Sequence, residues 1–195
     1  MLIILGLLAC ADVEEDEHDH DHDHEVITRV ELELTPSEGG DAIVAVFSDP
    51  DNAGEGTSET LTLPSTGSFD LSVLLFNELE EPMEELTDTI GVDGADEHQI
   101  FFTGDVDSEA SDAQDALIEI RYADSDSNGL PVGLLNSLSV LAAGTGELTL
   151  SLRHLPPVGD VAQKEAALAD TVASEGLVAI PGETDISVTF PLDIQ

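Results

Sequence analysis

The feature that most constrains the fold is a strict alternation of apolar and polar residues. Near the C-terminus, residues 185–194 place every second side chain in an apolar series: Ile186, Val188, Phe190, Leu192 and Ile194. Residues 26–34 alternate in much the same way. Successive side chains of a β-strand point to opposite faces, so a period of two predicts strands with one face in a core.

Further short apolar runs, bounded by turn residues, predict more strands. They occupy residues 41–48, 61–63, 69–76, 98–103, 117–122, 132–141 and 147–154. Residues 77–96 are acidic and ambiguous, and residues 81–86 within them fit either one helical turn or a weak edge strand. Residues 160–176 are the best helix candidate, with Asp160 as the cap and Gly176 as the end. Many short strands with few helices between them predict an all-β fold, an antiparallel β-sandwich of immunoglobulin-like or related type. Pro191 indicates an edge position for the last strand.

The charge of the chain restricts its partners. It carries 43 acidic side chains against 4 basic ones, a formal net charge of −39. Binding to nucleic acid depends on cations that neutralise phosphates, so this balance excludes a nucleic-acid partner. It also disfavours anionic lipid headgroups, so a membrane attachment has to come from acyl chains. Two compatible explanations are a salt-rich habitat, which we favour, and carboxylates that bind metal ions.

The N-terminal segment, residues 1–9, is apolar and leads into Leu7-Leu8-Ala9-Cys10. This pattern resembles the lipobox of a bacterial lipoprotein export signal, and it predicts that Cys10 is lipidated. The usual basic start is absent, so we expect the signal segment to be truncated, with its true start upstream. The alternative is a buried strand with an ordinary cysteine, although a densely charged tract follows at once. The apolar run is far shorter than the ~20 residues that span a bilayer.

Residues 10–25 are predicted to form a lipidated cysteine and a disordered spacer, followed by one domain over residues 26–195. Within the spacer, four histidines alternate with three aspartates: His18, His20, His22 and His24 with Asp19, Asp21 and Asp23. A flexible tract of this kind can fold imidazoles around Zn²⁺ or a related transition metal. The alternative is a solvated spacer that binds metal only because of its composition.

A second candidate metal site is the string Asp124-Ser125-Asp126-Ser127-Asn128-Gly129. Oxygens of Asp124, Asp126 and Asn128, with the carbonyl of Leu130, can converge on Ca²⁺ while the glycine permits a sharp turn. Its flanks are predicted strands, so it is not an EF-hand, and an ordinary hairpin loop explains the same residues. Asp49 and Asp51 lie in a weaker version of this pattern.

His98 and His154 form a third candidate, because each shares the apolar face of a predicted strand. Together with Glu97 they could hold zinc, but rim histidines that hydrogen-bond to the backbone are the favoured reading. Signature motifs of hydrolases, metalloproteases and nucleotide-binding enzymes are absent from the sequence. We therefore expect no enzymatic activity, and a hydrolase would need a pocket that the sequence does not indicate.

Several stretches together resemble small lipoproteins of Gram-negative bacteria that have no established activity. Besides the lipobox they are Glu25-Val26-Ile27-Thr28, residues 96–102, residues 124–129, residues 131–134, residues 144–154 and residues 182–190. The resemblance implies a lipid-anchored protein of the cell envelope with a sandwich-like domain, and residues 158–180 have no counterpart in it. It supplies no mechanism.

Two functions follow as expectations. The first is an exported, membrane-anchored binding or structural module, which Ca²⁺ could stabilise and whose protein or glycan partner the sequence does not identify. The second is a periplasmic or surface protein that buffers or delivers Zn²⁺ through the histidine–aspartate tract.

Overall fold

Strands form where the alternation of the sequence is regular. The structure, a computed structural model, describes residues 25–195. The longer strands are β1 (Arg29–Pro36), β2 (Ile43–Ser48), β5 (Ser68–Asn77), β7 (His98–Gly104), β10 (Ile118–Tyr122), β11 (Leu135–Val140), β12 (Gly144–His154) and β13 (Glu183–Ile194). The shorter ones are β3 (Thr57–Ser58), β4 (Leu61–Leu63), β6 (Glu84–Glu85), β8 (Val106–Ser108) and β9 (Ser111–Asp112). The predicted all-β fold is confirmed.

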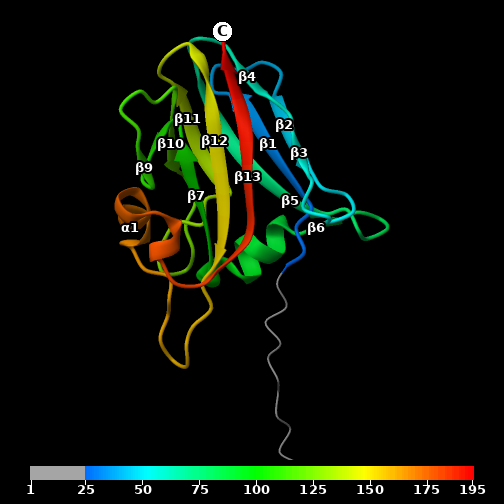
Figure 1. Cartoon of the computed structure of the whole chain (residues 1–195), viewed down its shortest axis with the longest axis vertical. Helices are drawn as coiled ribbons and strands as arrows, with labels where there is room; N and C mark the ends of the chain where they lie inside the picture. Colours follow the sequence, from blue (N-terminus) through cyan, green and yellow to red (C-terminus); the bar gives the residue numbers. More distant parts are fainter. Residues whose placement is uncertain (1–24) are drawn as a thin grey trace, which may run out of the picture.

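The strands form two sheets that face each other (Figure 1). The larger has the order β3-β2-β1-β5-β11-β10-β8-β9, with β6 paired to β5, and the smaller has the order β4-β13-β12-β7. Most neighbours are antiparallel, as predicted, but β8 with β10 and β4 with β13 are parallel pairs. The architecture is a β-sandwich with a largely antiparallel arrangement.

The core lies between the sheets and consists of the alternating apolar residues. Leu32 and Leu34 from β1, Leu150 from β12 and Phe190 from β13 are fully buried. Burial of such side chains stabilises a fold by ~1.5–3 kcal/mol each, and it fixes the strand register because a slip of one residue would turn them outward. The alternation therefore determines both the strands and the way they stack.

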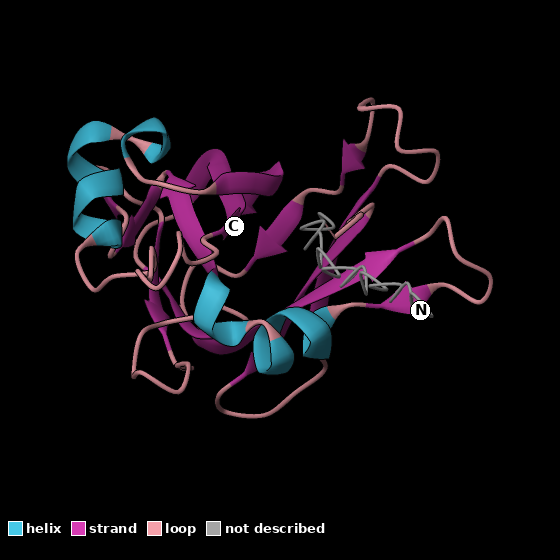
Figure 2. Ribbon diagram, turned by 90° about the horizontal axis from the view of Figure 1, so that it is seen from below, coloured by secondary structure: helices cyan, strands magenta, loops and turns pink. Residues whose placement is uncertain are grey.

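A second, smaller apolar cluster covers the outer side of β7. Helix α1 (Leu168–Glu175) packs Leu168, Ala169 and Val172 against Phe101, and Leu155 and Ile180 complete the cluster. Figure 2 shows α1 outside the strands. The segment from residue 155 to residue 180 thus folds back over the small sheet.

The helix prediction over residues 160–176 is wrong in its first half. The helix begins only at Leu168, and Asp160 does not cap it, because Val158 and Val161 pair with each other around a turn. Gly176 does end the helix, with a positive φ of 84°. Residues 162–167 are non-helical, and they carry Lys164 inward, as described below.

Two further expectations are settled by the strand pairing. Of the two alternatives for residues 81–86, the structure contains the strand, β6, which pairs with β5. Helical turns follow it at η1 (Thr89–Asp93) and η2 (Ala95–Glu97). The edge position predicted from Pro191 is wrong, since β13 lies between β12 and β4. The pairing of β13 with β4 starts only at Leu192. Pro191, which has no N–H to donate, therefore precedes the residues that pair with β4.

We use the term lower end for the end of the sandwich where β7 begins, β12 ends and β13 begins; it is the lower end in Figure 1. Ile27, near the first described residues, and Asp185 line one cavity there. The C-terminus lies at the opposite end (Figure 1). Across residues 25–195, the helices are too short or too polar to cross a membrane.

Candidate functional site

The polar residues of the lower end gather around one turn, Gly94 to Glu97, just before β7. Its carbonyls and carboxylates contact both the predicted histidine pair and the predicted calcium loop. The amide of Leu155 donates to the carbonyl of Glu97 at 2.6 Å, which fixes the turn to the end of β12. Asp96 accepts hydrogen bonds from the amide and hydroxyl of Ser127. One short segment therefore connects the two sheets and both candidate sites.

The structure brings His98 and His154 together. They are register partners in the β7–β12 ladder, and their rings stack with centroids 4.6 Å apart and planes 6° from parallel. Both are buried. The Nδ1 atom of His98 lies 2.8 Å from the carbonyl oxygen of Gly94. A carbonyl only accepts, so Nδ1 carries the proton of this hydrogen bond.

Each histidine also faces a carboxylate through its other nitrogen. Nε2 of His154 lies 3.5 Å from Oε2 of Glu97, the carboxylate that we considered beside this pair as a zinc ligand. Nε2 of His98 lies 3.8 Å from Oδ2 of Asp185, a buried side chain that sequence reasoning missed. Asp185 lies at an irregularity of the β12–β13 ladder, where the register shifts. A bulge turns a side chain to the other face, and the alternation pattern gives no sign of it.

A zinc site at this pair stays a prediction. Imidazole nitrogens bind a metal in the plane of the ring, and two parallel, stacked rings do not direct their nitrogens at one point. Among residues 25–195, we find no group of three or more His, Cys, Asp or Glu side chains arranged around a common ion position. Zinc binding here would require one ring to rotate out of the stack.

The carboxylate of Asp124 is saturated by main-chain donors. Oδ1 accepts from the amides of Val132 and Gly133, and Oδ2 accepts from the amides of Leu134 and Leu135, at distances from 2.7 to 3.3 Å. These bonds fold the segment after the loop back toward its start and lead it into β11. Asp124 thus has a structural role that the spacing of the acidic residues did not reveal.

Asp126 pairs with Lys164, the only lysine of the chain. Oδ1 of Asp126 accepts from the amides of Asn128 and Leu130, both at 2.8 Å, and Oδ2 lies 2.9 Å from Nζ of Lys164. Nζ also donates to the carbonyl of Ala95 at 2.7 Å. The two side chains are 0% and 1% exposed. Lys164 therefore holds the loop and the turn together from inside.

Burial and pairing shift both groups of this ion pair. Burial raises the pKa of Asp126, but the hydrogen bond from Lys164 and those from the loop amides outweigh it, so the pKa lies below its usual 3.8. Burial lowers the pKa of Lys164 below its usual 10.5, and the charge of Asp126 offsets only part of that effect. The pairing thus favours the carboxylate form of Asp126, whereas burial disfavours the ammonium form of Lys164.

Calcium binding at Asp124, Asp126, Asn128 and Leu130 also stays a prediction. The four residues do lie in one compact loop. Their carboxylates already accept protein donors, and Nζ of Lys164 occupies one coordinating position. Ca²⁺ would have to displace this lysine. In the weaker loop, Asp49 accepts from the amides of Ala53 and Gly54, and Asp51 is exposed.

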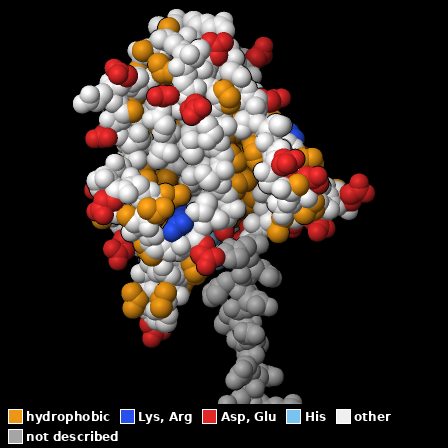
Figure 3. All heavy atoms as spheres, in the orientation of Figure 1, with side chains coloured by type: hydrophobic (Ala, Val, Ile, Leu, Met, Phe, Trp, Pro, Cys, Tyr) orange, Lys and Arg blue, Asp and Glu red, His pale blue; other side chains and the backbone are white. Residues whose placement is uncertain are grey.

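The other three basic residues are engaged as well. Arg29 pairs with Glu31 and Glu78, and Arg121 pairs with Asp107 and Glu119. Arg153 donates to the carbonyls of Ile180 and Pro181, which ties the end of β12 to the segment that follows α1. Acidic side chains spread over the surface seen in Figure 3. The few cations thus make contacts that join separate segments.

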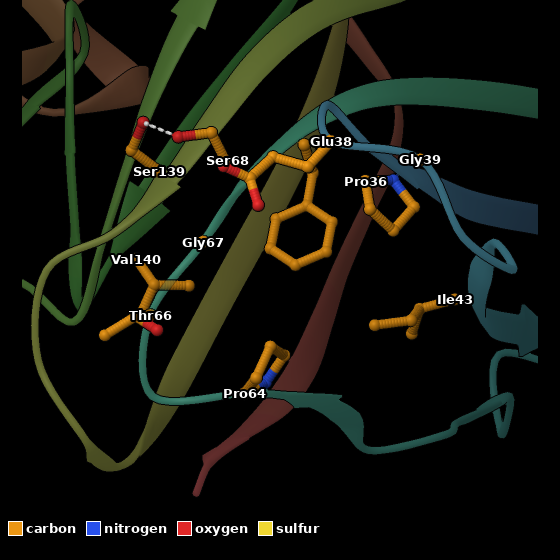
Figure 4. Close-up of a pocket in the computed structure, with 11 residues that line it drawn as sticks. Pro36, Glu38, Gly39, Ile43, Pro64, Thr66, Gly67, Ser68, Ser139 and Val140 are labelled. Carbon is orange, nitrogen blue, oxygen red and sulfur yellow. Dashed lines mark hydrogen bonds between the residues drawn. The ribbon is translucent and has the colours of Figure 1, made fainter.

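A cavity of about 660 Å³ opens at the other end of the sandwich (Figure 4). Pro36, Ile43, Pro64 and Val140 line it, and a hydrogen bond of 3.3 Å between the hydroxyls of Ser68 and Ser139 lies at its side. Its lining combines apolar groups with a single charged residue, Glu38. It is a candidate contact surface at the end remote from Glu25.

The remaining predicted site residues lie outside the described part of the chain. They are Cys10, His18, His20, His22, His24, Asp19, Asp21 and Asp23. Of the residues in the contacts described above, sequence reasoning missed Asp185 and Lys164, and only for Lys164 was there a signal in the sequence. The sequence feature that could have pointed to Lys164 is its rarity, since it is one lysine in a chain with 43 acidic residues.

Comparison with known proteins gives no relative. No protein-family model, curated protein or solved structure matches the chain.

Tyr122, the only tyrosine, provides a test of the packing beside this site. Its hydroxyl donates to the carbonyl of Ile100 at 2.6 Å, and burial raises its pKa above the usual 10.0. Above pH 10.0 the unfolded chain loses this proton and the folded protein keeps it, so the free energy of unfolding should fall as the pH rises. Phenolate absorbance should appear only as the protein unfolds.

The control is Tyr122→Phe, which removes the titrating group while keeping the ring. Its free energy of unfolding should lose the part of the alkaline dependence that comes from this residue. Phenolate absorbance near pH 10.0 in protein whose circular dichroism is still native would contradict the packing described for Tyr122.

Proposed function

We propose that this chain is a lipid-anchored protein of the bacterial cell envelope whose β-sandwich acts as a binding or structural module. The observation that carries the proposal is the lipobox Leu7-Leu8-Ala9-Cys10, followed at once by a charged tract and then by a folded domain. Acyl chains on Cys10 would attach the protein to the membrane, while an acidic tract would keep the sandwich in solvent.

The architecture is consistent with this arrangement. The first described residues lie at the lower end and the C-terminus lies at the opposite end (Figure 1). A protein anchored through its N-terminus would present the far end, with the cavity near Pro36 and Val140, away from the membrane. We infer that this far end meets a neutral or cationic partner, because the surface carries so many carboxylates.

The proposal includes no enzymatic activity, and the polar groups at the lower end contact the protein itself. Asp126 and Lys164 are shielded from solvent, so a substrate from outside cannot reach them. Asp124 is bound to four main-chain amides. These groups support the loops rather than a substrate. In this proposal, Ca²⁺ would stabilise the module only by displacing Lys164 from the carboxylate of Asp126.

The test is the fate of Cys10 in a Gram-negative host. The full chain, preceded by a complete export signal, should incorporate labelled fatty acid and sediment with membranes. Cys10→Ser, which removes the only thiol, should incorporate none and should be released to the soluble fraction. Equal sedimentation and labelling of both proteins would refute the anchor.

We propose zinc handling by the tract as the second candidate function. The observation that favours it is the regular alternation of His18, His20, His22 and His24 with aspartates. Imidazoles bind Zn²⁺ only when deprotonated, so binding should weaken below pH ~6.5.

Calorimetry with Zn²⁺ separates the tract from the sandwich. The full chain with the four tract histidines changed to alanine should lose tight binding. The matched control, His98→Ala with His154→Ala, should keep it. Loss of binding in the control alone would move the zinc site to the stacked pair, and growth unaffected by zinc limitation or excess would argue against a role in zinc handling.

A further inference from the structure

The only lysine of the chain lies next to a buried carboxylate, that of Asp126. Nζ of Lys164 is 2.9 Å from Oδ2 of Asp126, and the two side chains are 1% and 0% exposed. Lysine side chains are normally exposed at the surface, and an unneeded one is readily replaced. In a chain with 43 acidic residues, the one lysine is therefore buried rather than exposed to solvent.

The two oxygens of Asp126 differ in their surroundings. Oδ1 accepts hydrogen bonds from the amides of Asn128 and Leu130, both at 2.8 Å. Two such donors stabilise negative charge that develops on an oxygen during acyl transfer. Oδ2 faces the lysine nitrogen. Two main-chain donors thus lie at Oδ1, and the lysine nitrogen lies beside Oδ2.

The nucleophile is also positioned. Nζ donates to the carbonyl of Ala95 at 2.7 Å, and the turn that carries Ala95 is fixed by the bond from Leu155 to Glu97. Groups held in contact in this way react as if at very high concentration. An amide nitrogen at the same place retains one N–H, which can still donate to Ala95.

We propose that Lys164 and Asp126 join in an intramolecular amide bond. A proton passes from the ammonium of Lys164 to Oδ2 of Asp126, giving a neutral amine beside a carboxylic acid. The amine lone pair attacks Cγ, and an electron pair of the carbonyl moves to Oδ1, between the two loop amides. A second proton passes from Nζ to the departing Oδ2, the C=O bond re-forms, and one water leaves.

The reaction needs no oxidant, metal or other reactant, because an ammonium and a carboxylate become an amide and water. It also removes two opposite charges from a site where solvating them is costly. The product would tie the loop between β10 and β11 to the segment between β12 and α1, across the two sheets. The single cysteine of the chain leaves no internal disulfide to make such a cross-link.

The test is a tryptic map of the denatured full chain. The basic residues are Arg29, Arg121, Arg153 and Lys164, so cleavage of an unlinked chain gives residues 122–153, 154–164 and 165–195 as separate peptides. Trypsin cannot cut after a lysine whose nitrogen is acylated. We expect residues 122–153 joined to residues 154–195, at a mass about 18 Da, one water, below their sum.

The matched control is Lys164→Arg, which keeps the positive charge and the tryptic site but does not form this amide. It should give the separate peptides. The wild-type map decides the question by itself if the variant fails to fold. Recovery of unmodified residues 154–164 from aged wild-type protein, with its lysine open to amine reagents after denaturation, would overturn the proposal and leave a simple ion pair.

Discussion

The contact on which the lower end of this protein depends is the buried meeting of Lys164, Asp126 and the carbonyl of Ala95. It joins a loop of the large sheet, the turn before β7 and the segment that leads to α1. While the two side chains form an ion pair, removal of one partner leaves an uncompensated buried charge, which usually costs ~3–5 kcal/mol. The stacked histidines, which the β7–β12 ladder positions, and the docked helix, which packs on Phe101, lie close to this contact in the chain.

The carboxylates of the acidic loops share one structural role, which is to accept hydrogen bonds from main-chain amides. A carboxylate in a loop can satisfy main-chain amides as well as it can bind a cation, and here Asp124, Asp126 and Asp49 all accept such amides. Loop carboxylates at alternate positions therefore resemble calcium ligands in sequence. In Asp126 the remaining negative charge meets an ammonium group from the chain itself. Calcium binding and this internal cation are competing uses of the same oxygens.

The fold could be predicted from the sequence because the alternation of apolar and polar residues is a local pattern. Burial of the apolar residues then determines which face of each strand meets the core. Strands such as β13 appeared where Ile186 to Ile194 alternate. The strand faces of His98 and His154 indicated only that the two could meet, and the β7–β12 register brings them together. The helix start was misplaced because Lys164 is drawn inward by a partner 38 positions earlier in the sequence, at Asp126. The bulge that directs Asp185 to His98 likewise depends on strand pairing, which no local pattern encodes.

The most direct test of the role of Lys164 is hydrogen exchange at the amides of Asn128 and Leu130, measured in the wild-type protein and in the variant Lys164→Met. Both amides donate to Asp126, and Lys164 is what holds that carboxylate in place. We expect strong protection of both amides in the wild type and loss of it in the variant, while amides in the centre of β12 stay protected in both proteins. Equal protection of the loop in the two proteins would contradict the central role of Lys164.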